Sequence, residues 1–392
     1  MQEIEVIRAT RRFLKEHGLS GTAVLEPLFT DAHPTLLGAA DLGPFQRFTL
    51  AFDGFAVHPD LVGRLADGES LVAIEAKGSK DFLRGIAQAE LYRRGFHIVL
   101  LACAGRPPQE LLTLARQHSI GVIAVFPRQV EVLELPPAHL PQLRHAERIR
   151  RQFAVNVALI SPFYFNLPTH YLAMVPVLWV WEQERDDAWA PLRELAPMAR
   201  AYYQVLPQSD ASLGGALRGA AKLGLVELQA DRARLTFTGR TVATLLPTAS
   251  QLAQLHLQLV TGKRGKTLAA LNPQVGAVLR LLMSRDPVAQ LLITTLQAAG
   301  APLSMRALVL LSAERDRALT PAIFFHPEAV STITGDDGRI LWHKVEARHF
   351  RSTTFMQYKS VLKHAGILAP HTLGGSSSKT YDPDQDIWEL AA

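Results

Sequence analysis

The stretch between His58 and Gly78 sets charged side chains beside an apolar strand, and it constrains the fold more than any other part of the chain. The run Leu71-Val-Ala-Ile74 is apolar on both faces, which predicts a central strand covered on both sides. Side chains alternate along a strand, so Glu75 and Lys77 point to the same face, about 7 Å apart. Charged groups at the end of buried strands are costly unless they are paired. A divalent metal and a phosphate would satisfy these two groups together with Asp60.

The bulk composition is that of an ordinary globular protein. A chain of 392 residues, 48% hydrophobic and 20% charged, is long enough for two or three domains. We find no uninterrupted apolar run of about 18 residues and no signal-peptide core, so we expect no membrane association. The single cysteine, Cys103, excludes an internal disulfide and suits a reducing cytoplasm. The net charge of +5 permits binding to a polyanion but does not require it.

Residues 1–135 predict one α/β domain in the order α-β-β-β-α-β-α-β, which favours a mixed sheet flanked by helices. Apolar spacing predicts helices at 3–17, 81–94 and 108–118. Strands are expected at 47–52, 57–65, 71–76, 98–102, 121–126 and 129–135.

Residues 136–160 predict a proline-rich linker and a basic helix, Arg144–Arg151, which is either solvated or in contact with a DNA backbone. Two segments downstream, in the regions 161–248 and 249–392, share a pattern of helix, glycine break and β-hairpin. Their helices are expected at Ser212–Leu223 and Ser352–Ala365. Both segments resemble the recognition helix and wing of winged helix-turn-helix domains. Such modules bind DNA or dock other proteins.

The hairpin also carries a resemblance. Pro59-Asp60 and Glu75-Ala76-Lys77 lie on neighbouring strands, and the next helix places Gln88 and Tyr92 four residues apart on one face. This set resembles the PD-(D/E)xK nuclease superfamily, to which restriction endonucleases, junction resolvases and many repair nucleases belong. The resemblance covers about the first third of the chain. It implies a restriction endonuclease-like fold, with Gln88 near the catalytic centre.

The resemblance implies a metal-dependent phosphodiesterase. Asp60, Glu75 and the carbonyl of Ala76 are the expected Mg²⁺ ligands, and Mn²⁺ is expected to substitute. A bound metal polarises the phosphate and lowers the pKa of an attacking water. Lys77 is expected to orient or deprotonate that water. The alternative is a surface ion pair on a hairpin, which explains the charges but not their position.

A further acid is expected from the first helix. Glu3 and Glu5 are the candidates, and only one of them can face the site. The alternative for each is a carboxylate that caps the helix or interacts with its dipole.

Exposed polar residues of the two winged-helix-like modules are the candidates for DNA contact, with a solvated helix face as the alternative. In the first module they are Arg218, Lys222, Arg232 and Arg234, and in the second Thr353, Gln357, Lys359 and Lys363.

These patterns together predict a Mg²⁺-dependent endonuclease that acts on double-stranded DNA, in restriction or another defence against foreign DNA, with repair or recombination next. One active site cuts one strand, so we expect a homodimer or a member of a multi-protein complex. The alternative is a DNA-binding adaptor or regulator whose nuclease activity is dormant or depends on a partner. An RNA substrate remains open.

Overall fold

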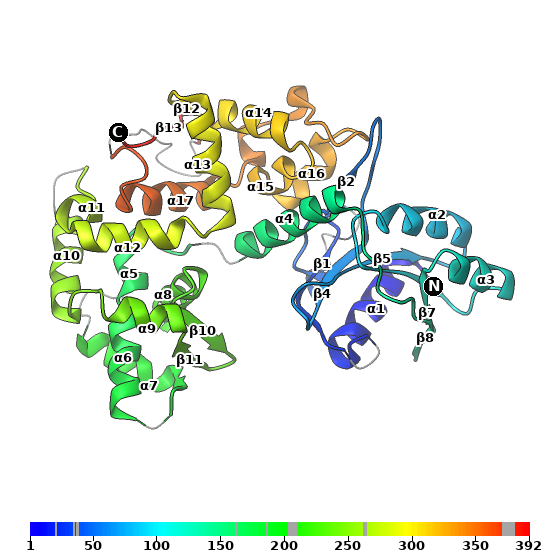
Figure 1. Cartoon of the computed structure of the whole chain (residues 1–392), viewed down its shortest axis with the longest axis horizontal. Coiled ribbons are helices and arrows are strands. Elements are labelled where there is room, and N and C mark those ends of the chain that lie inside the picture. The colour runs from blue at the N-terminus through cyan, green and yellow to red at the C-terminus, as the bar shows by residue number, and fades with distance from the viewer. Residues whose placement is uncertain are drawn as a thin grey trace. The chain divides into compact units, whose positions relative to one another are not determined.

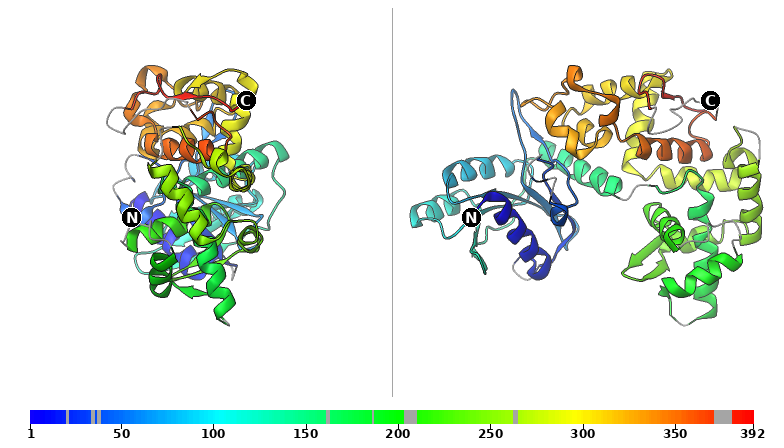
Figure 2. Two further views of the ribbon diagram at one scale, coloured as in Figure 1. Left: turned by 90° about the vertical axis from the view of Figure 1, so that its left-hand side faces the viewer. Right: turned by 180° about the vertical axis from the view of Figure 1, so that it is seen from behind.

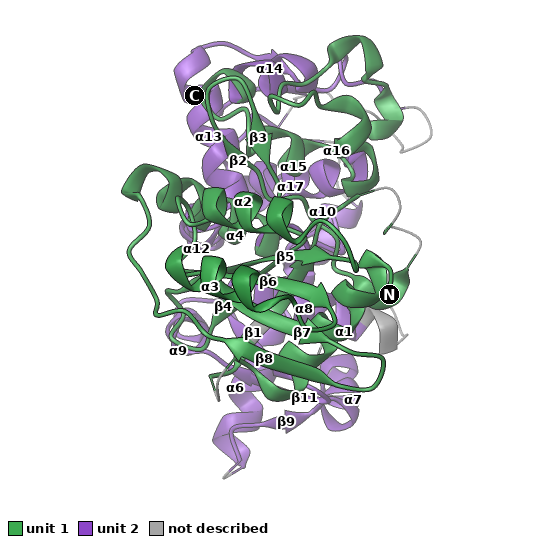
Figure 3. Cartoon of the chain, turned by 90° about the vertical axis from the view of Figure 1, so that its right-hand side faces the viewer, with its two compact units in different colours: residues 1–157, 313–349 green, residues 158–312, 350–392 purple. Residues whose placement is uncertain are grey.

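The computed structural model describes residues 1–19, 22–33, 36, 39–160, 163–185, 187–202, 210–261, 265–370 and 381–392. Figures 1 and 2 show its helices and strands from three sides. The chain divides into two compact units (Figure 3). Unit 1 comprises Met1–Val157 and Ala313–His349, and unit 2 comprises Ala158–Ser312 and Phe350–Ala392.

Unit 1 is built on a six-stranded mixed sheet in the order β1-β4-β5-β6-β7-β8. The strands are β1 (Val24–Thr30), β4 (Leu61–Leu65), β5 (Leu71–Lys77), β6 (Ile98–Ala104), β7 (Gly121–Val125) and β8 (Val130–Glu134). The pairs β5–β6 and β6–β7 are parallel, and the remaining pairs are antiparallel. The predicted mixed sheet between helices is therefore confirmed.

Helices cover both faces of this sheet (Figure 1). Helix α1 (Glu3–His17) packs on one face, and α2 (Phe82–Tyr92), α3 (Gln109–Gln117) and α4 (Leu143–Ile160) pack on the other. Residues of β5 alternate between the two cores, so Val72, Ile74 and Ala76 lie in the core beneath α1. Leu71 and Ala73 lie in the core beneath α2. The alternation puts Glu75 and Lys77 on the α2 face.

One strand of the structure was not predicted, and two predicted strands differ from the structure. The strand expected at 57–65 is divided into β3 (Ala56–Val57) and β4. Strand β1 was not expected, because it contains Pro27, which lacks an N–H donor; β1 lies at the sheet edge, where proline is tolerated. The expected strand at 47–52 is reduced to β2 (Leu50–Ala51), which pairs only with β3 (Ala56–Val57). This small hairpin forms a separate two-stranded sheet.

Unit 1 also contains a segment from late in the sequence, which the pattern analysis did not predict. Residues 313–349 carry α15 (Thr320–Phe324), α16 (Pro327–Ile333) and short 3₁₀ turns, and they belong with the first 157 residues (Figure 3). The buried Gln46 amide donates to the Ala322 carbonyl at 3.1 Å. The Ala56 N–H donates to the Asp336 carbonyl at 3.0 Å.

Unit 2 is mostly helical and contains the order helix–strand–helix–helix–strand–strand once in full and once with an isolated bridge in place of the second strand. The first copy is α6 (Met174–Glu184), β9 (Ala190–Pro191), α7 (Leu192–Tyr202), α8 (Asp210–Lys222), β10 (Val226–Gln229) and β11 (Arg232–Leu235), with sheet order β10-β11-β9. The second is α13 (Pro287–Ala299), β12 (Leu303–Ser304), α14 (Met305–Arg315), α17 (Ser352–His364), a Leu368–Leu390 bridge and β13 (Ile387–Trp388), which pairs with β12. The segment that belongs to unit 1 interrupts this second copy.

The other helices of unit 2 are α5 (Thr169–Leu172), α9 (Phe237–Ala243), α10 (Ala249–Thr261), α11 (Leu268–Leu271) and α12 (Pro273–Met283). Residues 371–380, within the β-hairpin expected after the helix Ser352–Ala365, lie outside the described residues. Of the helices described, none has the length and apolar composition that crossing a bilayer requires.

Gly85 lets α2 approach the sheet closely. A Cβ at this position would lie 2.7 Å from Leu101 Cδ1 and 2.9 Å from Lys77 Cγ. We expect Gly85→Ala to destabilise the protein by about 1–3 kcal/mol, because overpacking outweighs the gain in helix propensity of about 1 kcal/mol. Gly214→Ala is the control, since its nearest neighbour, Arg218, would be 3.7 Å away. Chemical denaturation measures both, and equal stabilities of the two variants would contradict the close packing.

Candidate active site

The hairpin of β4 and β5 brings the predicted acidic residues together. Its antiparallel register pairs Leu61 with Ile74, so the chain immediately before β4 lies beside the end of β5. There the Ala76 N–H donates to Asp60 Oδ2 at 2.6 Å. The N–H and C=O of one strand residue point to the same side, so the Ala76 carbonyl is directed toward the same edge.

Glu75 is a buried carboxylate, 2% exposed, and both of its oxygens have donors. Lys77 Nζ donates to Oε1. The Tyr92 hydroxyl lies 2.6 Å from Oε2 and 2.8 Å from the His58 carbonyl oxygen, so its one proton serves either acceptor. Burial raises the pKa of Tyr92 well above its ordinary value, and the nearby Glu75 charge raises it further. The phenol therefore stays protonated and acts as the donor.

Two opposing effects set the charge of Lys77. Burial lowers its pKa, but the charge and hydrogen bond of Glu75 raise it, and the net direction is upward. Lys77 is therefore a cation, held beside a carboxylate in a partly desolvated position.

At Asp60 the two largest effects act in the same direction. Burial raises the pKa of its carboxyl well above the ordinary value, and the negative charge of Glu75 raises it further. Burial also raises the pKa of Glu75, although Lys77 and Tyr92 oppose that shift. The positive charge of Lys77 thus compensates only part of the cost of burying two acids, Asp60 and Glu75, in one site.

The structure brings Glu3, and not Glu5, to this site. Glu3 Oε2 lies 4.0 Å from Lys77 Nζ. Glu5 instead accepts the Gln2 N–H at 2.7 Å, as part of a capping box at the start of α1. Glu3 and Asp60 both line a cavity of about 400 Å³. The other lining residues are Gln2, Ile4, Asp31, His33 and Leu36.

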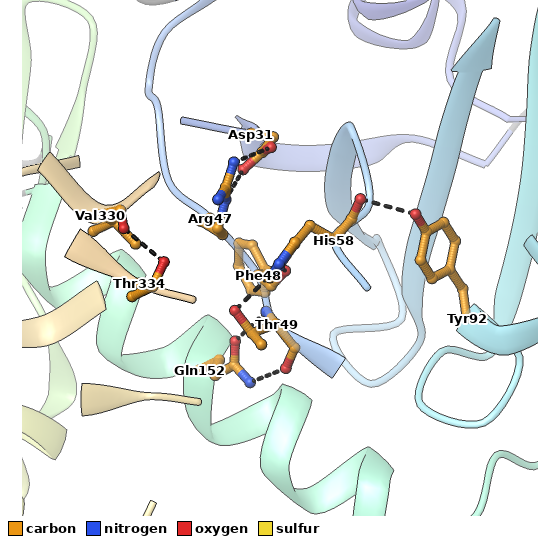
Figure 4. Close-up of polar contacts among 9 residues, drawn as sticks. All are labelled: Asp31, Arg47, Phe48, Thr49, His58, Tyr92, Gln152, Val330 and Thr334. Atoms are coloured by element: carbon orange, nitrogen blue, oxygen red, sulfur yellow. Dashed lines mark hydrogen bonds and ion pairs between the residues drawn. The ribbon is translucent and has the colours of Figure 1, made fainter. Parts of the chain in front are cut away.

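Asp31 is a site residue that the sequence did not reveal. It lines the cavity, and the Arg47 guanidinium contacts both of its carboxylate oxygens at 2.9 and 3.0 Å (Figure 4). Its backbone N–H donates to the Asp60 carbonyl at 2.8 Å. Asp31 directly follows β1, the strand that the pattern did not predict, so no sequence signal marked it.

The His58 side chain is held within the fold. Its Nδ1 lies 3.1 Å from the Phe48 carbonyl and 3.3 Å from Thr49 Oγ1 (Figure 4). Burial and then the charge of Arg47 lower the pKa of His58 to about 4, so the ring is neutral at pH 7.

Gln88, predicted to lie near the site, is partly buried on α2. Its side-chain oxygen is buried and has no hydrogen-bond partner among the described residues. In that part of the chain no hydrogen bond joins Gln88 to Asp60, Glu75 or Lys77, whereas Tyr92, one turn later, bonds Glu75 directly. The structure therefore supports a contact with the buried acid for Tyr92 only.

The donor set fits a hard divalent cation. Asp60 Oδ1 has no hydrogen bond to any described residue, and each carboxylate oxygen can accept more than one partner. Among the described residues, no three His, Cys, Asp or Glu side chains form a group that would hold a metal by themselves. Mg²⁺ usually takes one or two carboxylates and completes its shell with water and substrate phosphate.

Two of the lysines predicted to face solvent are buried in unit 2. Lys222 has a side chain 3% exposed, which donates to the Ala158 carbonyl and lies 3.5 Å from Asp286. The Lys359 side chain is 6% exposed and lies 2.6 Å from Asp386. The prediction that they point outward is wrong, because each is paired with an acid distant in sequence.

The other DNA-contact candidates are at least partly accessible. Arg218 is exposed and lies over the Tyr164 ring at 4.5 Å. In the β10–β11 hairpin, Arg232 is 3.6 Å from Asp187, and Arg234 is 2.7 Å from Glu227. On α17, Thr353 is exposed, while Gln357 and Lys363 are partly buried.

Comparison of this chain with protein-family models, with curated proteins and with solved structures finds no match.

The raised pKa of Asp60 predicts how stability depends on pH without added metal. The folded chain holds this proton more tightly than the unfolded chain, so stability falls as pH rises from the ordinary value of 3.8 through the raised folded pKa. We expect Asp60→Asn to remove that loss and to be more stable than the wild type at pH 7. Thermal unfolding in a chelator between pH 4 and 8 measures the difference.

Asp41 is the control of opposite sign. Its hydrogen bond to Arg8 lowers the pKa of this exposed carboxyl, so its stabilising contribution is lost as pH falls. Asp41→Asn should therefore bring no gain at pH 7. An Asp60→Asn variant that is no more stable than Asp41→Asn at pH 7 would contradict the raised pKa of Asp60.

Proposed function

We propose that this chain is a Mg²⁺-dependent DNA endonuclease. The observation that carries the proposal is the convergence of Asp60, Glu75 and Lys77 at the end of one hairpin, with Glu3 beside them at an open cavity. A structural ion pair needs only one acid and one base. Here Glu3 and Asp60 line a cavity wide enough for a phosphate group, and the buried Glu75 shares Lys77 with Glu3.

The proposed metal ligands are Asp60, Glu75 and the Ala76 carbonyl, with Glu3 as the further acid. When bound, Mg²⁺ polarises the scissile phosphate and lowers the pKa of the attacking water. Asp60 Oδ2 is held by the Ala76 N–H, which orients the carboxylate. Tyr92 and Lys77 restrain the two oxygens of Glu75 in the same way.

Lys77 is proposed to orient the attacking water and to offset negative charge that develops on the phosphate. Its raised pKa favours the role of a cationic donor over that of a base. Gly85 leaves room for its alkyl chain beneath α2.

The two modules of unit 2 are proposed to be winged-helix domains that bind duplex DNA. The first has the order helix–strand–helix–helix–strand–strand, and the second has a Leu368–Leu390 bridge in place of the second strand. In each, the last strand returns to pair with the first. Arg218, Arg232 and Arg234 are the proposed contacts in the first module. Thr353, Gln357 and Lys363 are the proposed contacts in the second.

The proposed role is restriction or another defence against foreign DNA. One catalytic centre in the chain cuts one strand, so cutting both strands calls for a second copy or a larger complex. An adaptor with a dormant nuclease centre predicts salt-sensitive DNA binding without cleavage.

Plasmid cleavage in Mg²⁺ or Mn²⁺ tests the catalytic proposal. We expect Asp60→Asn and Lys77→Met each to lower the cleavage rate about 100-fold or more, because each removes charge from the reacting centre. Lys15→Met is the matched control, since Lys15 is exposed on α1. No cleavage by wild type, or equal cleavage by Lys77→Met, would refute the nuclease. DNA binding without cleavage would favour the adaptor.

Metal-dependent stability gives a test that is independent of turnover. Mg²⁺ at 100 times its dissociation constant should stabilise the wild type by about 2.7 kcal/mol. We expect this increment to be absent in Asp60→Asn and reduced in Glu3→Gln. It should be retained in Glu5→Gln, because Glu5 caps the helix instead. Equal increments in Glu3→Gln and Glu5→Gln would show that Glu3 is not a ligand.

A further inference from the structure

Unit 1 contains a second polar cavity, of about 400 Å³, that shares no lining residue with the cavity at Asp60. It is lined by residues 51–53 of the β2–β3 hairpin, by Arg144, His145 and Arg148 of α4, and by residues 313–318. We call it the basic cavity. Three segments far apart in sequence converge here, and the third belongs to the late segment that returns to unit 1 (Figure 3).

The guanidinium groups of this cavity are in excess over ion-pair partners. Arg144, Arg148 and Arg317 line it, and none of the three has an ion pair with a described residue. Arg315 is a fourth lining arginine. Of the acids around it, Asp316 already accepts the Leu319 N–H at 3.1 Å. The basic stretch Arg144–Arg151, which the proposed nuclease site does not use, thus places two of its arginines in one concave surface.

The surroundings of His145 give a second measure of the local charge. Burial lowers the pKa of its ring, and Arg148, Arg144 and Arg94 lower it further. Its Nδ1 is buried and has no hydrogen-bond partner among the described residues. By count, the four arginines that line the cavity exceed its three acids, Asp53, Glu314 and Asp316.

Hydrogen bonds hold the walls of the cavity in place. The Gln152 side chain of α4 bonds both the N–H and the C=O of Thr49, at 2.9 and 2.8 Å (Figure 4). Arg317 Nη2 donates to the Phe52 carbonyl at 3.3 Å. The Ala56 N–H bonds the Asp336 carbonyl. The arginines are thus presented by segments that are already tied together, which lowers the entropy lost on binding.

We propose that the basic cavity binds a backbone phosphate of duplex DNA away from the point of cleavage. Planar guanidinium groups match phosphate oxygens, and contacts of this kind position a duplex without reading its sequence. The inference rests on the proposed function for its choice of DNA. The same chemistry would accept a free phosphate or an RNA backbone, and the experiment separates these sources.

The test measures binding of the full chain to a mixed-sequence DNA duplex between 50 and 200 mM KCl, with Ca²⁺ in place of Mg²⁺. We expect Arg144→Ala/Arg148→Ala to reduce the slope of log affinity against log salt by about two and to weaken binding roughly 10- to 30-fold at 150 mM. Arg12→Ala/Arg128→Ala is the matched control. Both of these arginines are exposed in unit 1 and lie outside the cavity.

Several outcomes overturn the proposal. The first is a slope of log affinity against log salt that is unchanged in Arg144→Ala/Arg148→Ala. The second is an equal loss of DNA affinity in the control variant, and the third is no binding of duplex DNA by the wild type. Tighter arginine-dependent binding of an RNA duplex would replace DNA as the ligand. Stabilisation by inorganic phosphate that disappears in the variant, with DNA affinity unchanged, would replace it by a small phosphate. An unchanged melting temperature of each variant excludes misfolding as the cause.

The experiment separates this inference from the proposed nuclease. If the wild type binds DNA through Arg144 and Arg148 but cuts none, the cavity assignment stands and the nuclease fails. If Arg144→Ala/Arg148→Ala binds and cuts as the wild type does, while Asp60→Asn does not cut, the nuclease stands and the cavity assignment fails. If both proposals hold, the arginine variant raises KM and leaves kcat unchanged.

Discussion

The buried carboxylate of Glu75 is the group on which the arrangement of the candidate site depends. Leaving such a charge without partners inside a protein costs several kcal/mol. Lys77 from the same strand and Tyr92 from α2 supply the partners, and Tyr92 also reaches the His58 carbonyl. One buried charge therefore ties β5 to α2 and to the chain that leads into β4. The same requirement holds Lys77 in place 4.0 Å from Glu3, which lines the cavity.

The sequence predicted this hairpin because its signals are local. Alternation along β5 placed Glu75 and Lys77 on one face, and the helical spacing of four put Tyr92 on the face that meets them. The choice between Glu3 and Glu5 depended on which carboxylate capped α1, and helix-start acids look alike in sequence. Asp31 was missed with its strand, since a proline-containing edge strand carries little periodic signal.

The basic residues show where helical periodicity does not predict burial. An apolar stripe marks one face of a helix, and the lysines off that stripe were expected to face solvent. Lys222 and Lys359 are buried instead, each beside an aspartate more than 25 residues away in sequence. No local sequence pattern predicts an aspartate partner at that separation. Burial lowers the pKa of both lysines, and the paired aspartates oppose that shift. Their positive charge serves packing in unit 2 and not a DNA surface.

The return of residues 313–349 makes unit 1 dependent on the C-terminal half of the chain. Without that segment the Gln46 side-chain amide and the Ala56 N–H would lose these hydrogen bonds, and the basic cavity would lose a wall. The chain crosses between the units three times, so the proposed DNA-binding modules and the proposed nuclease unit are covalently linked. If both units bind one duplex, binding by either unit raises the effective concentration of DNA at the other. Under both proposals, phosphate contacts at the basic cavity would position a duplex that the modules of unit 2 select, without reading its sequence themselves.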